Sequence, residues 1–143
     1  MHQIDFILDL TLKGQTWPQL TVNLDSYQAI LEFDQNHARA VMSVNTTAST
    51  SELVLTIAGL APDTQISLES LSFFGVRDPR FLWAGIYRPC YPQPWASQQT
   101  HLPPIHTNIT VLGWDGVWGL EITNPVFTWM HQKLGLGRIY SPG

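Results

Sequence analysis

The most regular feature of the chain is an alternation of apolar and polar residues. It is clearest from Ile4 to Leu12, where every second residue is apolar. A period of two indicates a β-strand with one buried face. Comparable runs bounded by turn-forming residues follow at 20–24, 27–33, 38–44, 52–59, 66–74 and 81–87. Their number and spacing are typical of antiparallel sandwiches, so the pattern predicts an all-β fold.

Two further alternating runs flank Asp115 and Gly116, and this pair is typical of a two-residue hairpin turn. A type I′ turn needs positive φ at both central positions, which Asp-Gly tolerates. Counting outward predicts three facing pairs on the core side: Ile109 with Ile122, Val111 with Leu120, and Gly113 with Trp118. In this register Trp118 covers Gly113 and is buried, while Trp114 at the tip is the more exposed tryptophan.

The segment from Asn124 to Gly135 has the start and stop signals of a short helix. Asn124 can cap it, Pro125 suits its first position, and Gly135 can end it. Its apolar side would dock on a sheet through Val126, Phe127, Met130 and Leu134. The prediction is one domain spanning residues 1–143: an antiparallel β-sandwich, jelly-roll-like or otherwise Greek-key, with about nine strands and one short C-terminal helix.

Composition adds one informative number. Only 13% of the 143 residues are charged, whereas soluble domains average about 25%. One interpretation is that partner proteins cover much of the surface. The other is a small neutral β-protein that solvates itself with Thr, Ser, Gln and Asn. Composition leaves both open.

Several functional classes lack their usual sequence signals. The net charge is -4 and no cluster of Lys or Arg occurs, so we expect no nucleic-acid partner. No apolar run is long enough to cross a membrane, and the N-terminus has no basic region of a signal peptide. A single cysteine, Cys90, excludes an internal disulfide and favours synthesis in a reducing cytosol.

Candidate chemistry is equally sparse. His101 and His106 lie close in sequence, but their spacing matches no zinc pattern. No carboxylate pair, nucleophile motif or glycine-rich phosphate loop is evident. We therefore expect no enzymatic activity, no metal and no cofactor.

The proline-rich segment from Arg88 to His106 is the strongest candidate for contacts. Its five prolines exclude a central strand or a helix, and long loops in compact domains are usually functional. Three interpretations of it remain. It is the principal contact with a neighbouring subunit, or a sugar platform in which flat rings stack on a pyranose, or a segment that folds back over an open sheet edge and seals its own domain. The candidate residues for the subunit contact or the sugar platform are Tyr87, Arg88, Tyr91, Trp95 and Trp114.

The other tryptophans have simpler expected roles. We expect Trp83, Trp118 and Trp129 to belong to the core. We expect Trp17, like Trp95, to fill a loop gap or a subunit contact.

The run GWDGVWGLEITNPVFTWMHQ, together with the preceding YRPCYPQPW stretch, resembles C-terminal segments of small β-sandwich structural proteins of tailed bacteriophages. The resemblance covers roughly Tyr87 to Tyr140 and contains no catalytic motif. It implies a virion component made in the host cytoplasm, of the cement, neck, baseplate or fibre-attachment class. Its partners would be other copies of itself or other virion proteins. The alternative is a lectin-like carbohydrate-binding module.

Overall fold

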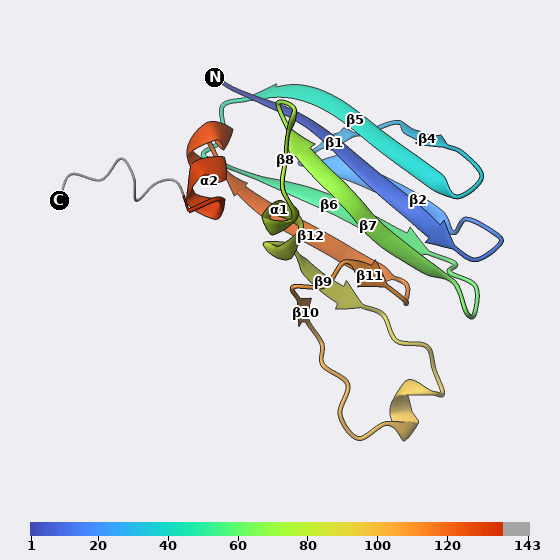
Figure 1. Ribbon diagram of the computed structural model, residues 1–143. Helices are drawn as coiled ribbons and strands as arrows, with labels where there is room; N and C mark the ends of the chain where they lie inside the picture. Colours follow the sequence, from blue (N-terminus) through green and yellow to red (C-terminus); the bar gives the residue numbers. More distant parts are fainter. Residues whose placement is uncertain (136–143) are drawn as a thin grey trace.

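The protein is a sandwich of two antiparallel sheets in a computed structural model, whose residues 1–135 are described (Figure 1). The first sheet has the order β11 (Val111–Leu112), β7 (Gln65–Phe73), β1 (His2–Lys13), β5 (His37–Thr46) and β4 (Leu31–Phe33), with β8 (Val76–Arg77) paired to β7. The second has the order β10 (His106–Thr107), β9 (Ile86–Pro89), β12 (Gly116–Thr123), β6 (Thr50–Ala58), β2 (Gln19–Leu24) and β3 (Tyr27–Gln28). The predicted antiparallel sandwich is confirmed, although several of its strands are only two or three residues long.

The core lies between the two sheets and follows the predicted alternation. In β1 the apolar residues Ile4, Phe6 and Leu8 are buried, while Asp5 and Ile7 between them are only partly buried. Leu53 and Leu55 of β6 do the same from the second sheet. Each such side chain stabilises the fold by about 1.5–3 kcal/mol relative to leaving it in water.

Helix α2 (Val126–Lys133) closes one end of the sandwich and confirms the predicted C-terminal helix. Its Trp129 ring packs 5.4 Å from Phe73 and 5.5 Å from Phe81. The predicted cap is wrong, because Asn124 donates its side-chain N–H to Ala48 and Ser51 instead.

The predicted helix face also needs a correction. Val126 and Met130 are buried, but Phe127 is 54% exposed. It stacks on Phe74 at a ring separation of 4.5 Å. The helix therefore docks through Trp129 where the sequence pattern placed Phe127.

The predicted hairpin at Asp115 and Gly116 is wrong. Val111 pairs with Ser67 of β7 in the first sheet, whereas Trp118 pairs with Leu55 of β6 in the second. The chain therefore crosses between the sheets here instead of turning back on itself. An alternating run shows which face of a strand is buried but not which strand lies beside it.

Trp118 is buried and Trp114 is the more exposed of the two, as predicted, although the reason differs. Trp118 lies on Gly85, not on Gly113. A Cβ atom built on Gly85 would sit 2.4 Å from the indole ring, while one on Gly113 would meet nothing within 4 Å. The bare backbone at Gly85 is what makes room for the largest core side chain.

Two other predicted strands are interrupted. The run 27–33 divides into β3 and β4, which belong to different sheets. The run 81–87 begins with the one-turn helix α1 (Pro79–Trp83), because Asp78 caps it and Pro79 occupies its first position. Trp83 ends this helix and is 47% exposed, so its assignment to the core is wrong.

The contact between Gly85 and Trp118 can be tested with Gly85→Ala. We expect a loss of about 1–3 kcal/mol in the free energy of unfolding, since the methyl group must displace a buried indole. Gly119→Ala is the matched control, because a Cβ at Gly119 meets nothing within 4 Å. Urea denaturation of both variants measures the difference, and equal losses would contradict the packing described.

Candidate functional site

The proline-rich loop leaves the sandwich from one end and returns beside its own start (Figure 1). Its base is closed by β9 and β10, where Tyr87 pairs with His106. Between these strands, residues 90–105 include the short 3-10 helix η1 (Ala96–Gln98). This segment contains no Lys, Arg, Asp or Glu, so its solubility depends on uncharged polar groups and His101.

Four rings hold the loop against the segment that enters β12. Trp114 lies edge-on to Tyr91 at 5.0 Å and stacks with Trp95 at 6.3 Å. The centre of the His106 ring lies 6.0 Å from that of the Trp114 ring, and the two ring planes are inclined by 35°. We call these four residues the aromatic cluster. Its rings join residues far apart in sequence, so the loop is anchored by packing as well as by its ends.

Tyr91 also fixes the loop through hydrogen bonds. Its hydroxyl donates to the carbonyl of Pro103 at 2.6 Å and lies 2.7 Å from Nε2 of His106. Since the hydroxyl has a single proton, Nε2 of His106 is the donor in the second bond. Tyr91 therefore ties the outgoing half of the loop to the returning half.

Tyr87 is buried and does not belong to an open platform, which corrects the sequence-based expectation. Its inward position follows from its pairing with Trp118 in the ladder. The hydroxyl accepts from the backbone N–H of Trp114 at 3.1 Å and donates to the Trp114 carbonyl. Burial is the main reason that the pKa of Tyr87 rises to about 12, and the nearby Asp115 charge adds to the effect.

Asp115 connects three parts of the site. Its carboxylate accepts from the backbone N–H groups of Gly59 and Leu60 at 3.0 and 2.8 Å. Its backbone carbonyl accepts from the N–H of Cys90 at 2.6 Å. The next residue, Gly116, has φ +152 and approaches β9 so closely that a Cβ would lie 2.4 Å from the Arg88 carbonyl. Only glycine fits there without moving the start of the loop.

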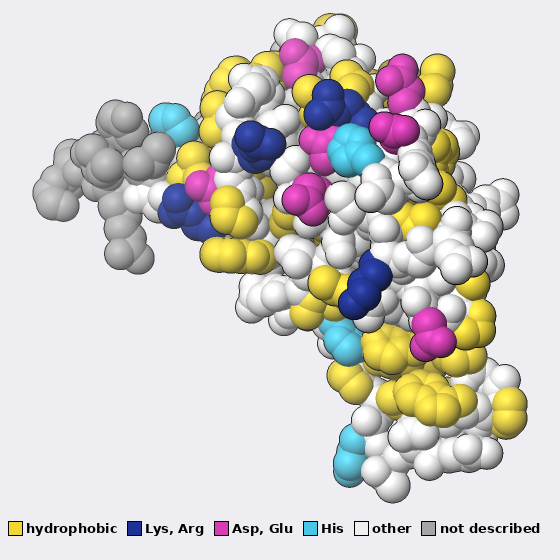
Figure 2. Space-filling model, turned by 45° about the vertical axis from the view of Figure 1, so that its right-hand side comes forward, with side chains coloured by type: hydrophobic (Ala, Val, Ile, Leu, Met, Phe, Trp, Pro, Cys, Tyr) yellow, Lys and Arg dark blue, Asp and Glu magenta, His cyan; other side chains and the backbone are white. Residues whose placement is uncertain are grey.

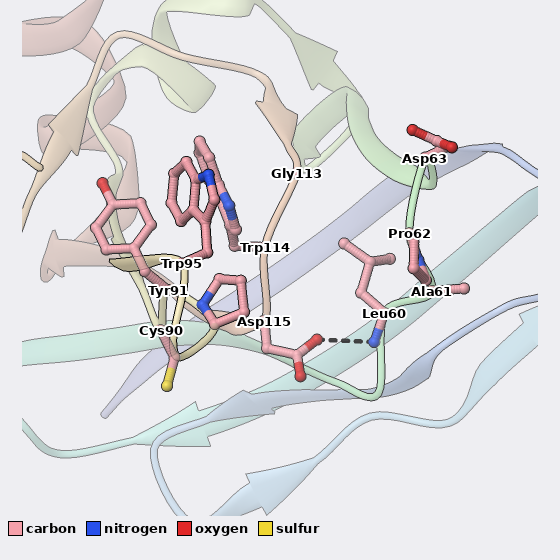
Figure 3. A pocket seen from close by; sticks show the side chains of 11 residues that line it. Leu60, Ala61, Pro62, Asp63, Cys90, Tyr91, Trp95, Gly113, Trp114 and Asp115 are labelled. Carbon is pink, nitrogen blue, oxygen red and sulfur yellow. Dashed lines mark hydrogen bonds between the residues drawn. The ribbon is translucent and has the colours of Figure 1, made fainter. Parts of the chain in front are cut away.

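The loop, Asp115 and the turn between β6 and β7 form the walls of a pocket of about 760 Å³ that is open to solvent (Figure 3). Tyr91, Trp95 and Trp114 stand on one side, and the turn between β6 and β7 stands on the other (Figure 3). Asp115 lies between them, and Asp63 is at the rim of the turn. The full lining is Leu60, Ala61, Pro62, Asp63, Cys90, Tyr91, Pro92, Trp95, Gly113, Trp114 and Asp115.

Three of the five candidate residues line this pocket: Tyr91, Trp95 and Trp114. Tyr87 does not line the pocket but is buried and bonds the backbone of Trp114, which does. Arg88 is exposed and does not line the pocket. The opposite wall, Leu60–Asp63, was not expected at the site. Ala61-Pro62-Asp63 is recognisable as a turn, but only the pairing of β6 with β12 brings that turn to the loop.

Comparisons with family models, curated proteins and solved structures find no match to this chain. Within residues 1–135, no group of three or more His, Cys, Asp or Glu side chains could hold a metal ion. Over the same range, none of the helices is both long and apolar enough to cross a membrane.

Tyr87→Phe tests the support beneath the pocket. The change leaves the Trp114 N–H and carbonyl without their partner, so we expect a loss of about 1–3 kcal/mol in the free energy of unfolding at pH 7.

The same variant has a pH signature. The pKa of Tyr87 is raised to about 12 in the folded state. The contribution of Tyr87 to the free energy of unfolding is therefore complete below about pH 10 and is lost as pH rises towards 12. The wild type should therefore lose more stability than Tyr87→Phe between pH 9 and 11.5 in urea denaturation. Parallel curves would contradict the buried hydroxyl.

Proposed function

We propose that the protein is a non-enzymatic structural subunit of a tailed-bacteriophage virion, assembled through contacts with copies of itself and with other virion proteins. The resemblance of its C-terminal third to small β-sandwich virion proteins supports this class. The low proportion of charged residues supports it independently, because subunit contacts remove surface from water. Cement, neck, baseplate and fibre-attachment positions all fit such a subunit.

The observation that carries the proposal is the exposure of large apolar side chains in the segment 27–33. Tyr27 and Phe33 are each 50% exposed, and Ile30 is 82% exposed. Covering this surface would contribute about 25 cal/mol for every Å² of apolar area. Three such side chains within seven residues form an apolar segment that a free monomer leaves in water.

The position of this segment in the fold also favours a contact. It links β3, the last strand of the second sheet, to β4, the last strand of the first. Open edges of this kind present unpaired backbone groups to other chains unless they are protected. The segment 27–33 therefore offers both backbone groups and apolar side chains to a neighbouring subunit.

Charged side chains are grouped on the body of the sandwich. Figure 2 shows most of the Lys, Arg, Asp and Glu side chains of the visible face on the body of the sandwich, while the projecting lower part shows hydrophobic, His and other uncharged side chains. Some of the charges pair within one sheet, as Asp9 does with Arg39 at 2.7 Å.

A carbohydrate-binding function is the second candidate. The observation in its favour is the pocket lined by Tyr91, Trp95 and Trp114. The two functions are compatible, because the segment 27–33 and the pocket involve different residues.

Light scattering of the purified chain tests the assembly proposal. We expect a concentration-dependent mass above the 16.1 kDa of one chain. Ile30→Asp should shift the protein to the monomer, because it replaces an apolar side chain of the contact with a negative charge close to that of Glu32. Since Ile30 is 82% exposed, the melting temperature should hardly change.

Val41→Asp is the matched control, a residue that is 57% exposed on β5. It should leave the mass unchanged. Self-association that persists in Ile30→Asp, or a wild type that stays monomeric at every concentration, would contradict assembly through the segment 27–33.

A further inference from the structure

We infer that the pocket between the proline-rich loop and the turn from β6 to β7 binds a neutral saccharide, with a pyranose ring against Trp95 and Trp114. This inference rests on the second candidate function, carbohydrate binding, and does not depend on the assembly proposal. It concerns different residues and a different kind of ligand.

The aromatic side of the pocket suits the apolar face of a sugar ring. Trp95 and Trp114 stack on each other at a ring separation of 6.3 Å with 29° between their planes, and both belong to the aromatic wall of the pocket (Figure 3). Trp95 is 39% exposed, and Trp114 is half-buried. Flat indole surfaces with a polar N–H are well suited to a ligand that is apolar on one side and wet on the other.

The wall is already in place before a ligand arrives. The backbone of Trp114 is fixed by the Tyr87 hydroxyl, which bonds the backbone N–H and the backbone carbonyl of Trp114. Tyr91 packs against both tryptophans. A preformed wall binds more tightly than a mobile one, because little side-chain entropy is lost on binding.

Polar groups without protein partners surround the wall. Among residues 1–135, neither the Trp95 nor the Trp114 indole N–H donates to a protein acceptor, and the Asp63 carboxylate accepts no protein hydrogen bond. Sugar hydroxyls both donate and accept, so they can satisfy the indoles and the carboxylate together.

The charge of the lining selects among sugars. Asp63 and Asp115 are its charged residues, and it contains no Lys, Arg or His. An acidic sugar or a phosphate would bring a like charge to within a few ångströms of Asp63, well inside the Debye length of about 8 Å at physiological ionic strength. The pocket volume of about 760 Å³ lies within the range of about 300–1,000 Å³ for small-ligand sites.

Binding can be measured with four trisaccharides: cellotriose, maltotriose and chitotriose as neutral probes, and trigalacturonic acid as the acidic one. Tryptophan fluorescence gives the affinity, and the indole N–H signals in ¹H–¹⁵N spectra give the position. We expect at least one neutral probe to shift the signals of Trp95 and Trp114. Trigalacturonic acid should bind at least about tenfold more weakly, or not at all.

Trp95→Ala should weaken binding of the neutral probe by about tenfold, with a melting temperature close to that of the wild type. Trp83→Ala is the matched control, because Trp83 is a similarly exposed tryptophan on α1 and does not line the pocket. It should bind as the wild type does. Asp63→Asn keeps the shape of this exposed side chain but removes its charge. It should reduce the difference in affinity between the neutral and the acidic probes.

The inference fails if no neutral probe binds, or if a proline-rich peptide shifts the same indole signals and the sugars do not. It also fails if Trp83→Ala loses as much affinity as Trp95→Ala, because binding would then lie elsewhere. If Trp95→Ala does not fold, Asp63→Asn decides: an unchanged preference for neutral over acidic probes would overturn the assignment of the pocket.

Discussion

The crossing of the chain at Gly113–Gly116 is the constraint on which this end of the molecule depends. Before it, Leu112 pairs in the first sheet, and after it Gly116 pairs in the second. Asp115 holds the turn from β6 to β7 with its carboxylate and the start of the loop with its carbonyl. Gly116 has no side chain, so β9 can lie directly against it. One short crossing therefore sets the distance between both walls of the pocket.

The strands and the core could largely be predicted from the sequence, because period-two alternation reports burial directly. It identified the strand from Ile4 to Leu12 and its buried face. Strand partners could not be predicted in this way. Asp115 and Gly116 have the composition of a hairpin turn, yet their flanking runs pair with β7 and β6. Local turn preference was outweighed by the pairing of both runs with strands distant in sequence.

The candidate site was predictable only as a set of residues, not as a shape. Proline and aromatic composition pointed to Tyr91, Trp95 and Trp114, which do meet. Tyr87 belongs to the same stretch but faces inward, since the residue opposite it in the ladder is Trp118. Asp63 comes from a turn some thirty residues earlier in the chain. Its place at the pocket depends on tertiary pairing that no local pattern contains.

The closure of the proline-rich loop at its own base has a consequence for variation of this protein. Because His106 returns directly beside Tyr87, the chain enters and leaves the loop through two adjacent strands. Insertions, deletions or exchanged residues within 92–102 would leave the ends of β9 and β10 in place. The sandwich can thus stay constant while the length and composition of the loop vary.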